Sequence, residues 1–402
     1  MLTLSLQSRP QHAYLQKTVG ESFHKGIQIS RDCEMIASKC EELVREQEEV
    51  ISNIGMKTVD SRAALLAFIE ESVRQEDMHL CTDEYTGAIN TREESLKSLH
   101  DMGYPIFGNV VVGRKLNNIK KTLRKLVELS DDNRRVHPKL SVAVTNRLIY
   151  SEPAIMSIRK ELVWSVIEPR NEGWELFSVD IKSQEPWILA NMLNIVPLKK
   201  LMMNDVDFYE GIYMLATGDT LTDKQRTVIK RVWNSITYGA ARKTVEGYAS
   251  VKGAAVYDFL MSMPEYKAYR NDIFKRARNG RRCISTAFGT EIYADESGSK
   301  LARSLLDLPI QGSGADILSM LVYALNSVVE QKGLSDYIEF YLSRHDEIVV
   351  MADTNAISEQ EVVGFLESVM VHQVEGWVPF KVIVSNLSKM DKSKLYYNLT
   401  EE

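Results

Sequence analysis

The chain has 402 residues, of which 44% are hydrophobic and 26% are charged, and its formal net charge at pH 7 is −6. This composition is typical of a globular protein of about two to three lobes, and it excludes a uniformly cationic protein that coats nucleic acid. The four cysteines show no C-x-x-C spacing, which argues against a disulfide framework and a zinc site. No apolar run reaches the ~20 residues of a membrane span. We therefore expect no membrane partner, and any surface for nucleic acid must be local.

The first third of the chain is predicted to be helical. Residues from about 12 to 50 read as one long helix interrupted near Gly26, and residues 60 to 100 read as short helices separated by polar turns. From Gly113 to Leu129, apolar residues recur at helical spacing on one face. The opposite face is basic and includes Lys120, Lys121 and Arg124. A helix with an apolar back and a basic front suits gripping a duplex backbone without reading its sequence.

Two apolar runs each lead to an aspartate. Gly173 to Val179 is a strand by composition and ends at Asp180, after which the chain turns into a helix that has Pro186 in its first turn. Phe340 to Val350, F-Y-L-S-R-H-D-E-I-V-V, is predicted to be a hairpin around His345, Asp346 and Glu347. A strand end is a rigid place to hold a metal ligand, although a single strand-end aspartate is usually a turn residue or a cap.

A third stretch, R-T-V-I-K-R-V-W-N-S-I-T-Y-G from Arg226 to Gly239, is predicted to be a helix that begins near Asp223 as N-cap. One stripe of its surface is formed by every fourth residue, namely Arg226, Lys230, Asn234 and Tyr238. Cations suit a triphosphate, and a ring beside a glycine suits a flat base. The plainer alternative is a solvated basic helix that is capped by Gly239.

The C-terminal half alternates helices and strands. Pro264 to Ala277 is predicted to be a helix, Thr286 to Tyr293 a hairpin and Val378 to Val384 a strand. Between them, Leu301 to Ile317 contains R-S-L-L-D-L-P-I-Q-G. Upstream, Val144 to Pro153 reads V-T-N-R-L-I-Y-S-E-P.

The stretches around Asp180, Arg226 to Gly239 and Asp346 resemble motifs A, B and C of the family A DNA polymerases, in the family's order. The first is most similar to the mitochondrial gamma branch, whose pattern is D-x-x-S-Q-E-x-W. The segment with Arg147 resembles the family's T-G-R-L, and the segment with Arg303 and Gln311 resembles R-x-x-x-N-x-P-x-Q-G. The resemblance covers nearly the whole chain.

This resemblance implies an α/β (α+β) right-hand fold with an antiparallel-sheet palm, helical fingers and a helical thumb. The expected parts are an N-terminal palm base or helical segment at 1–50, the thumb at 51–140, the palm with motif A at 141–200, the fingers with motif B at 201–299 and the palm with motif C at 300–402.

The implied activity is template-directed addition of dNTPs to a primer 3′ end by two-metal-ion phosphoryl transfer. Two Mg²⁺ ions, or Mn²⁺ in their place, are expected on Asp180 and Asp346, with Glu347 as a further ligand. Lys230 resembles the general acid for the pyrophosphate leaving group, so the expected catalytic residues are Asp180, Asp346 and Lys230. Glu185 resembles the family's steric gate against a ribose 2′-hydroxyl.

The resemblance also assigns binding residues. The expected nucleotide-binding residues are Arg226, Lys230, Asn234, Tyr238, Glu185 and Tyr209. The expected DNA-binding residues are Arg147, Arg159, Arg303, Gln311, His345, Lys120, Lys121 and Arg124. Three positions depart from the family: Asn234 replaces the usual Phe or Tyr along the incoming sugar, Tyr209 replaces a phosphate-contacting His, and Asp307 replaces an Asn.

Two other functions stay open at this point. A single-subunit RNA polymerase would share the fold, but Glu185 argues against a site that admits the 2′-hydroxyl. A catalytically silent DNA-binding subunit is the second alternative, and the retained Asp180, Lys230 and Asp346 argue against it. Because the polymerase-like region begins almost at Met1, we expect no 3′–5′ exonuclease domain, and a separate exonuclease or processivity factor would be a reasonable partner. The expected location is a bacterial or phage-infected cytoplasm, with an organellar matrix as the alternative.

Overall fold

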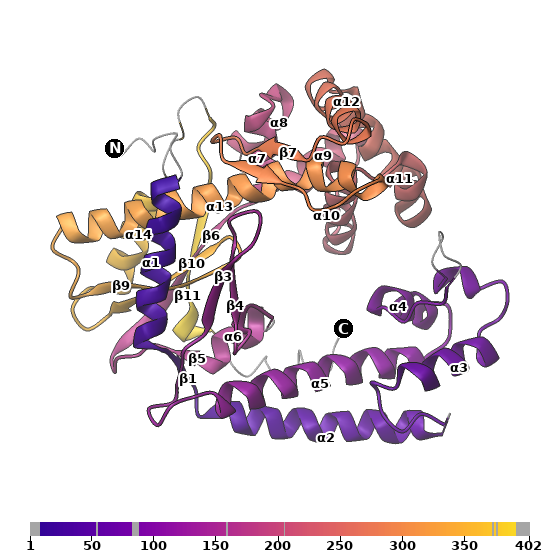
Figure 1. Ribbon diagram of the computed structural model, residues 1–402, viewed down its shortest axis with the longest axis horizontal. Helices are drawn as coiled ribbons and strands as arrows, with labels where there is room; N and C mark the ends of the chain where they lie inside the picture. Colours follow the sequence, from indigo (N-terminus) through magenta and orange to yellow (C-terminus); the bar gives the residue numbers. More distant parts are fainter. Residues whose placement is uncertain are drawn as a thin grey trace. The chain divides into compact units, whose positions relative to one another are not determined.

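The structure is a computed structural model that describes residues 9–53, 55–82, 88–157, 160–204, 206–371, 374 and 377–390. Its chain divides into two compact units (Figure 1). The first unit contains the described residues of Met1–His24, Leu140–Ile149 and Asn171–Leu387, and the second contains those of Lys25–Lys139, Tyr150–Arg170 and Ser388–Glu402. Both units are discontinuous in sequence, so neither corresponds to one uninterrupted segment.

A four-stranded antiparallel sheet lies in the first unit, with the strand order β11-β6-β10-β9. Its strands are β6 (Trp174–Ile181), β9 (Ile338–Arg344), β10 (Glu347–Asp353) and β11 (Val382–Asn386). The two central strands, β6 and β10, are largely buried, as expected for runs rich in Val, Ile, Leu and Phe. The register pairs Asp180 on β6 with Glu347 on β10, so the acidic ends of the central strands meet.

Three helices pack within the same unit: α13 (Ser299–Gln331), α14 (Glu359–Met370) and α1 (Arg9–Lys25). α13 contacts β9 and α14, and α14 contacts β6 and β11. The segment Lys300–Gln331 is long and apolar enough to cross a membrane by length and composition, but 78% of its most apolar window is buried inside the protein, as in a core helix. α1 is tied to α13 through His12, whose Nε2 lies 2.5 Å from Asp316 Oδ1 and whose Nδ1 lies 2.7 Å from Ser319 Oγ.

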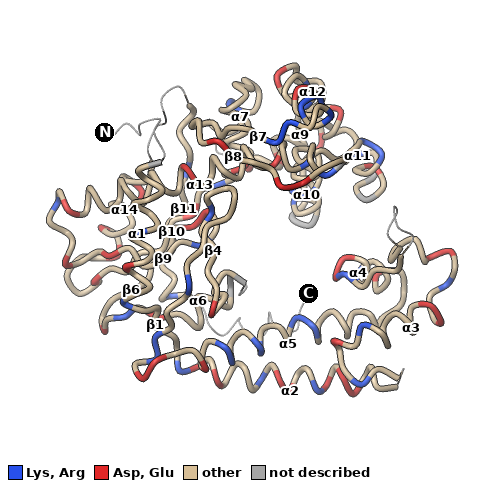
Figure 2. The backbone as a smooth tube through the Cα atoms, viewed as in Figure 1, with Lys and Arg blue, Asp and Glu red and all other residues tan. Residues whose placement is uncertain are grey.

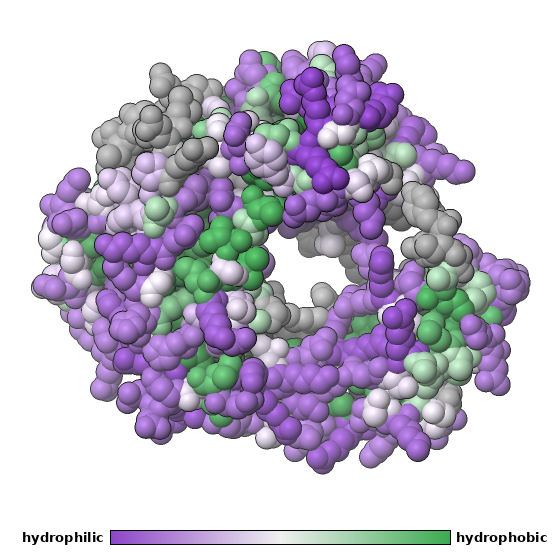
Figure 3. Space-filling view, viewed as in Figure 1, coloured by the Kyte–Doolittle hydropathy of each residue, from purple (hydrophilic) through white to green (hydrophobic). Residues whose placement is uncertain are grey.

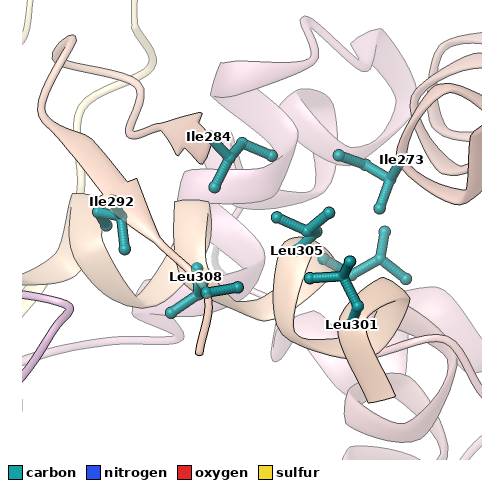
Figure 4. Packing of buried hydrophobic residues seen from close by; sticks show 8 residues of the cluster. Ile273, Ile284, Ile292, Leu301, Leu305 and Leu308 are labelled. Atoms are coloured by element: carbon teal, nitrogen blue, oxygen red, sulfur yellow. The ribbon is translucent and has the colours of Figure 1, made fainter. Parts of the chain in front are cut away.

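Between β6 and α13 the chain forms a group of helices and one hairpin. The elements are α7 (Gln184–Met192), α8 (Val196–Met203), α9 (Phe208–Thr217), α10 (Asp223–Thr237), α11 (Arg242–Ser262), α12 (Pro264–Arg278), β7 (Cys283–Ser285) and β8 (Glu291–Tyr293). Figure 4 shows how Ile273 of α12 and Ile284 of β7 converge on Leu305 of α13 in a buried cluster. Gly312 permits the close approach of β8 to α13, because an added Cβ would lie 2.4 Å from Ile292 Cδ1.

The second unit is built on two long helices, α2 (Asp32–Ser52) and α5 (Ile106–Glu128), which pack along each other. Its shorter elements are α3 (Arg62–Ser72), η1 (Met78–Leu80), α4 (Glu93–Asp101), η2 (Ile155–Ser157), α6 (Lys160–Val166) and η3 (Leu387–Lys389). A small sheet has the order β2-β1-β5, with β1 (Ile27–Ile29), β2 (Arg135–Val136) and β5 (Ile167–Glu168). Gly113 lies against Val59, where an added Cβ would come within 2.4 Å of Val59 Cγ1.

A separate two-stranded hairpin consists of β3 (Lys139–Val142) and β4 (Leu148–Ser151). Its tip turns at Asn146, which has a φ of +61°, and Arg147 follows directly. The exposed apolar side chains on this hairpin are Val142, Val144 and Ile149. Figure 3 shows hydrophilic residues over much of the visible surface, interrupted by hydrophobic patches.

The predicted helix over residues 12 to 50 is present as α1 and α2, but the break at Gly26 contains a strand that was not predicted. Gly26 has a φ of +83° and leads into β1, which pairs with both β2 and β5. Those partners lie over 100 residues downstream, so local periodicity does not reveal the strand. The helix predicted from Gly113 begins earlier, at Ile106.

Two further boundaries differ from the prediction. α10 is capped by Thr222 rather than Asp223, and the Thr222 N–H donates to Gln225 Oε1 at 3.0 Å in a capping box. The last strand begins at Val382 rather than Val378. The Val378 N–H donates to Asn191 Oδ1 and its C=O accepts from Trp187 Nε1, both at 2.8 Å, so side chains bind this backbone in place of a sheet.

Candidate active site

Three carboxyl groups come to one end of the four-stranded sheet. Asp180 on β6 lies directly opposite Glu347 on β10. Asp346 is the residue before Glu347, in the two-residue connection between β9 and β10. Directly opposed residues of antiparallel strands point to the same face, with Cβ atoms about 4.5–5.5 Å apart. Glu347 is 2% exposed, whereas Asp180 and Asp346 are half-buried.

This set of oxygen donors suits a hard divalent cation. Mg²⁺ prefers one or two carboxylates together with waters and substrate phosphates over a cage made only of protein atoms. Among the described residues, no group of three or more His, Cys, Asp or Glu side chains is arranged to hold a metal ion by itself. The predicted ligands Asp180 and Asp346 supply the one or two carboxylates that Mg²⁺ commonly takes from a protein.

The turn that carries Asp346 is strained. His345 has a φ of +55°, a left-handed value that is uncommon outside glycine and costs ~1–3 kcal/mol. Desolvation, followed by the positive charges of Arg344 and Arg147, lowers the pKa of His345, so its imidazole is neutral at pH 7. This influence places Arg147 of the β3–β4 hairpin in the neighbourhood of the β9–β10 turn.

A hydrogen-bonded network joins α7, α10 and α13. The Tyr238 hydroxyl donates to Glu185 Oε2 at 2.5 Å, and Gln311 Nε2 donates to Glu185 Oε1 at 2.6 Å and to the Tyr238 oxygen at 2.9 Å. Burial, and then the negative charge of Glu185, raises the pKa of Tyr238, so the phenol keeps its proton and acts as a donor. We call Glu185, Tyr238 and Gln311 the three-residue network.

Backbone contacts fix the elements that carry this network. Gly314 lets α13 approach α7, because an added Cβ would lie 2.8 Å from Gln184 Oε1. Tyr238 is the C-cap residue of α10, and Gly239 after it has a φ of +97°, which glycine adopts without steric cost. The last carbonyls of α10 are bound from α12: the Tyr266 hydroxyl donates to the Ile236 C=O at 2.8 Å, and Arg270 donates to the same oxygen at 3.2 Å.

Asp307, which stands where the resembling family has Asn, lies one helical turn before Gln311. Burial, and then the negative charge of Glu185, raises its pKa to about 6, against the opposing effects of Arg147 and Gln311. Asp307 Oδ1 and Gln311 Oε1 are buried and have no hydrogen-bond partner among the described residues. Asn234 Oδ1 is also buried and has no hydrogen-bond partner among the described residues.

The four residues of the predicted stripe on α10 differ in exposure: Arg226 and Lys230 face solvent, and the later two are partly buried. Arg226 Nη2 lies 2.7 Å from Asp207 Oδ2, and the guanidinium carbon lies 5.3 Å from the centroid of the Tyr209 ring. Burial is the largest single influence and raises the pKa of Asp207, but the hydrogen bond and charge of Arg226 and the backbone N–H groups of Glu210 and Tyr209 together lower this pKa below its usual value. Lys230 is exposed, while Asn234 and Tyr238 are half-buried. Arg226 and Tyr209, which are far apart in sequence, thus form one contact.

Other predicted DNA-binding residues are spread over both units. In the second unit, Lys121 Nζ is 2.7 Å from Asp60, Arg124 pairs with Glu41, and Lys120 is half-buried. Arg159 lies outside the described residues. In the first unit, Arg303 is exposed on α13. Basic residues also gather at the end of α12 (Figure 2), where the exposed cations are Lys275, Arg278, Arg281 and Arg282.

Several supporting residues were not predicted. Asp207 caps α9 and pairs with Arg226. Its position in a turn-rich stretch before a helix indicates the cap, but nothing in the sequence indicates the pairing with Arg226. Arg270 and Tyr266 carry no local sequence signal, because their partners lie about 30 residues upstream. Asp316 is fully buried, accepts from Thr286 at 2.6 Å and Thr290 at 3.1 Å, and anchors the β7–β8 turn to α13.

Comparison with known proteins shows to which family the chain is similar. Residues 30–390 match the model of DNA polymerase family A. DNA polymerase I of Bacillus subtilis (strain 168) is 24% identical over 390 residues, which cover 90% of this chain and 43% of that protein. DNA polymerase I of Rhizobium leguminosarum is 23% identical over 335 residues, which cover 77% of this chain and 33% of that protein. The chain thus spans less than half the length of these relatives.

A solved structure, the POL domain of Pol1 from M. smegmatis in complex with DNA primer-template and dNTP, superposes with a TM-score of 0.79 and 22% sequence identity. The match covers 93% of this chain and 69% of that chain. It confirms the predicted α+β right-hand polymerase fold. Since the family match also covers most of the 402 residues, the chain belongs to DNA polymerase family A.

Proposed function

We propose that this chain is a DNA-directed DNA polymerase that adds dNTPs to the 3′ end of a primer on a template. The observation that carries the proposal is the β6–β10 register, which sets Asp180 opposite Glu347 and next to Asp346 at one end of a buried sheet. Phosphoryl transfer needs little covalent help from a protein and depends on positioning and charge stabilisation. Carboxylates on rigid strands meet that need.

Asp180 and Asp346 would hold two divalent cations, Mg²⁺ or Mn²⁺, with Glu347 behind them. When bound, such ions neutralise the charge on the attacking and leaving oxygens of the transferred phosphoryl group. The strands would keep the ligands fixed, because β6 and β10 are paired continuously from Trp174–Asp353 to Asp180–Glu347. The buried Glu347 lies on the same face as Asp180 and favours a cation there.

The chain's own cations would bind the triphosphate. Lys230 is exposed on α10, where it is free to reach a phosphate and to give a proton to the leaving pyrophosphate. Arg226, one turn earlier, would bind phosphate oxygens, either in place of Asp207 or in addition to it. The Tyr209 ring, which lies under the guanidinium, would help to hold it in position. Tyr238 would stack near the new base pair, and Asn234 would lie along the sugar. Glu185, held by Tyr238 and Gln311, would reject a 2′-hydroxyl.

Each unit carries candidate DNA-binding residues. Arg147, Arg303, Gln311 and His345 would contact the primer end and the template-primer junction, and so would Arg159. Lys120, Lys121 and Arg124 on α5 would contact the duplex backbone, which makes 51–140 the thumb. Residues 1–50 would form an N-terminal palm base or helical segment, the palm would comprise 141–200 and 300–402, and the fingers 201–299. We place the enzyme in a bacterial or phage-infected cytoplasm, where a separate exonuclease or processivity factor could assist it.

The test is primer extension with dNTPs, NTPs or no nucleotide. The wild-type chain should extend with dNTPs, and Asp346→Ala should lower extension by at least ~10³-fold, since a lost metal ligand removes several kcal/mol of charge stabilisation. Asp336→Ala, which removes an exposed aspartate from the turn before β9, serves as matched control and should extend normally. Extension by Asp346→Ala at the wild-type rate would contradict the site. Preference for NTPs would instead indicate an RNA polymerase.

A further inference from the structure

Two buried oxygen atoms beside the three-residue network lack a donor. Asp307 Oδ1 and Gln311 Oε1 have no hydrogen-bond partner among the described residues. Because the two residues are four apart on α13, their side chains are neighbours on one face of the helix. The Gln311 amide lies within hydrogen-bonding reach of the Asp307 carboxyl. Buried acceptors without donors are costly, so an explanation for this pair is needed.

A proton on Asp307 would supply the missing donor. An ionised carboxylate has only acceptors, and the carbonyl oxygen of Gln311 is also only an acceptor, so these two groups cannot pair. The carboxylic acid form has one O–H, which can donate to Gln311 Oε1. The same proton leaves both hydrogens of Gln311 Nε2 for Glu185 at 2.6 Å and Tyr238 at 2.9 Å.

The charges around Asp307 favour this proton. Burial, then Glu185 on α7 and more weakly Glu296 before α13, raises the pKa of Asp307 to about 6, while Arg147 and a hydrogen bond from Gln311 oppose them. The two phenols that feel its charge, Tyr238 on α10 and Tyr269 on α12, are buried, and this burial is the main reason that their own pKa values are raised. Both phenols are therefore neutral throughout the range in which Asp307 titrates.

We propose that Asp307 is a positioning residue for sugar selection: as a carboxylic acid it donates to Gln311 Oε1 and thereby holds Gln311 Nε2 on Glu185 and Tyr238. The inference rests on the proposed polymerase function. When Asp307 ionises, its carboxylate competes with Glu185 for the two hydrogens of the same amide nitrogen. Glu185 then keeps only the donor from Tyr238. The side chain that would reject a 2′-hydroxyl becomes less firmly placed, so sugar selection weakens as pH rises.

The experiment measures single-nucleotide insertion of dNTP and NTP opposite the same template base between pH 5.5 and 8.5. The readout is the ratio of the two kcat/KM values, which cancels every pH effect that both substrates share. In the wild-type chain, the preference for dNTP should fall by about 10-fold over this range, the effect of losing one hydrogen bond to a charged group.

Two variants separate positioning from a general pH effect. Asp307→Asn carries an amide that donates at every pH, so it should keep the low-pH preference throughout. Asp295→Asn removes an exposed carboxylate of the same type outside the network and should follow the wild-type profile. The wild-type chain should also show one ¹³C-labelled aspartate carboxyl resonance that titrates near pH 6 and is missing from Asp307→Asn.

The outcomes are distinguishable. Normal dNTP insertion with a preference that is constant in pH, or that changes equally in Asp307→Asn, would overturn the positioning role and leave the polymerase function intact. The absence of the titrating carboxyl resonance would overturn the role as well. Failure to insert dNTP at any pH would overturn the polymerase function, and this inference with it.

Discussion

Asp307→Asn should stabilise the chain more at neutral pH than in acid. The pKa of Asp307 is raised from 3.8 to about 6, first by burial and then by Glu185. A carboxyl group whose pKa is raised by folding binds its proton more tightly in the folded chain. Its stabilising contribution is therefore complete below the unfolded pKa and is lost as pH rises through the folded value, here between about pH 4 and pH 6. Above that window the wild-type chain carries a buried anion that asparagine removes.

The magnitude follows from the shift. A change of about two pKa units corresponds to ~3 kcal/mol at 1.36 kcal/mol per unit. Asp307 is half-buried, so water screens part of this free energy, and some of the loss has already occurred at pH 4.5. We expect the stabilisation by Asp307→Asn to grow by ~1–2 kcal/mol between pH 4.5 and pH 7.5. For a domain of this size, the difference in Tm should grow by about 2–4 °C.

Thermal unfolding of the wild-type chain and of Asp307→Asn at both pH values is the assay. Asp295→Asn is the matched control, because its side chain is exposed and its substitution should shift Tm equally at the two pH values. A Tm difference for Asp307→Asn that stays constant, or that shrinks as pH rises, would refute the reasoning. Such a result would show that the positive charge of Arg147 fully offsets the free-energy cost of burying the Asp307 carboxylate.

Three further predictions concern the proposed reaction. Asp180→Ala should abolish dNTP addition but leave primer-template binding within several-fold, because it removes a proposed metal ligand and no proposed DNA contact. Near wild-type extension in Mg²⁺ would contradict this. Glu185→Ala should raise NTP incorporation relative to dNTP opposite the same template base, and an unchanged ratio in a folded, active variant would turn attention to Asn234. The 402-residue chain should not degrade a mismatched primer from its 3′ end, since its proposed acidic site is assigned to polymerisation. Degradation that survives Asp180→Ala would be the contrary result.

The elements that are marked by strong local patterns could be predicted from the sequence. The apolar runs before Asp180 and around Asp346 are strands, and the stretch from Arg226 is a helix, because hydrophobic period and glycine punctuation act over a few residues. β1 was missed, because its strand character depends on pairing with distant partners. The strand predicted from Val378 starts too early for a similar reason. The Val378 backbone is bonded to the side chains of Asn191 and Trp187, which are distant in sequence, so no local pattern reveals these bonds.

The site divides in the same way. Motif order was enough to select Asp180, Asp346 and Glu185 as candidates, and the β6–β10 register shows why Asp180 and the turn that carries Asp346 lie at the same end of the sheet. The motifs do not reveal the residues that hold the site residues in position. Arg270 binds three carbonyls at the end of α10 and thus orients the residues after it, yet nothing near Arg270 in the sequence marks it. Support of this kind depends on tertiary contacts, which no local pattern encodes.

Asp307 shows how a departure from a family pattern acquires a physical meaning only in the fold. In sequence, Asp in place of Asn is a change of one atom and one charge. In the structure, the carboxyl group lies beside Gln311, under the influence of Glu185 from α7 and Arg147 from the β3–β4 hairpin. Burial and Glu185 together outweigh Arg147, so near pH 6 the side chain divides between an anion and a neutral acid. The neutral acid, like the asparagine amide, can donate a hydrogen bond to its neighbour, so under the proposal this chain keeps that donor in acid and loses it as pH rises through about 6.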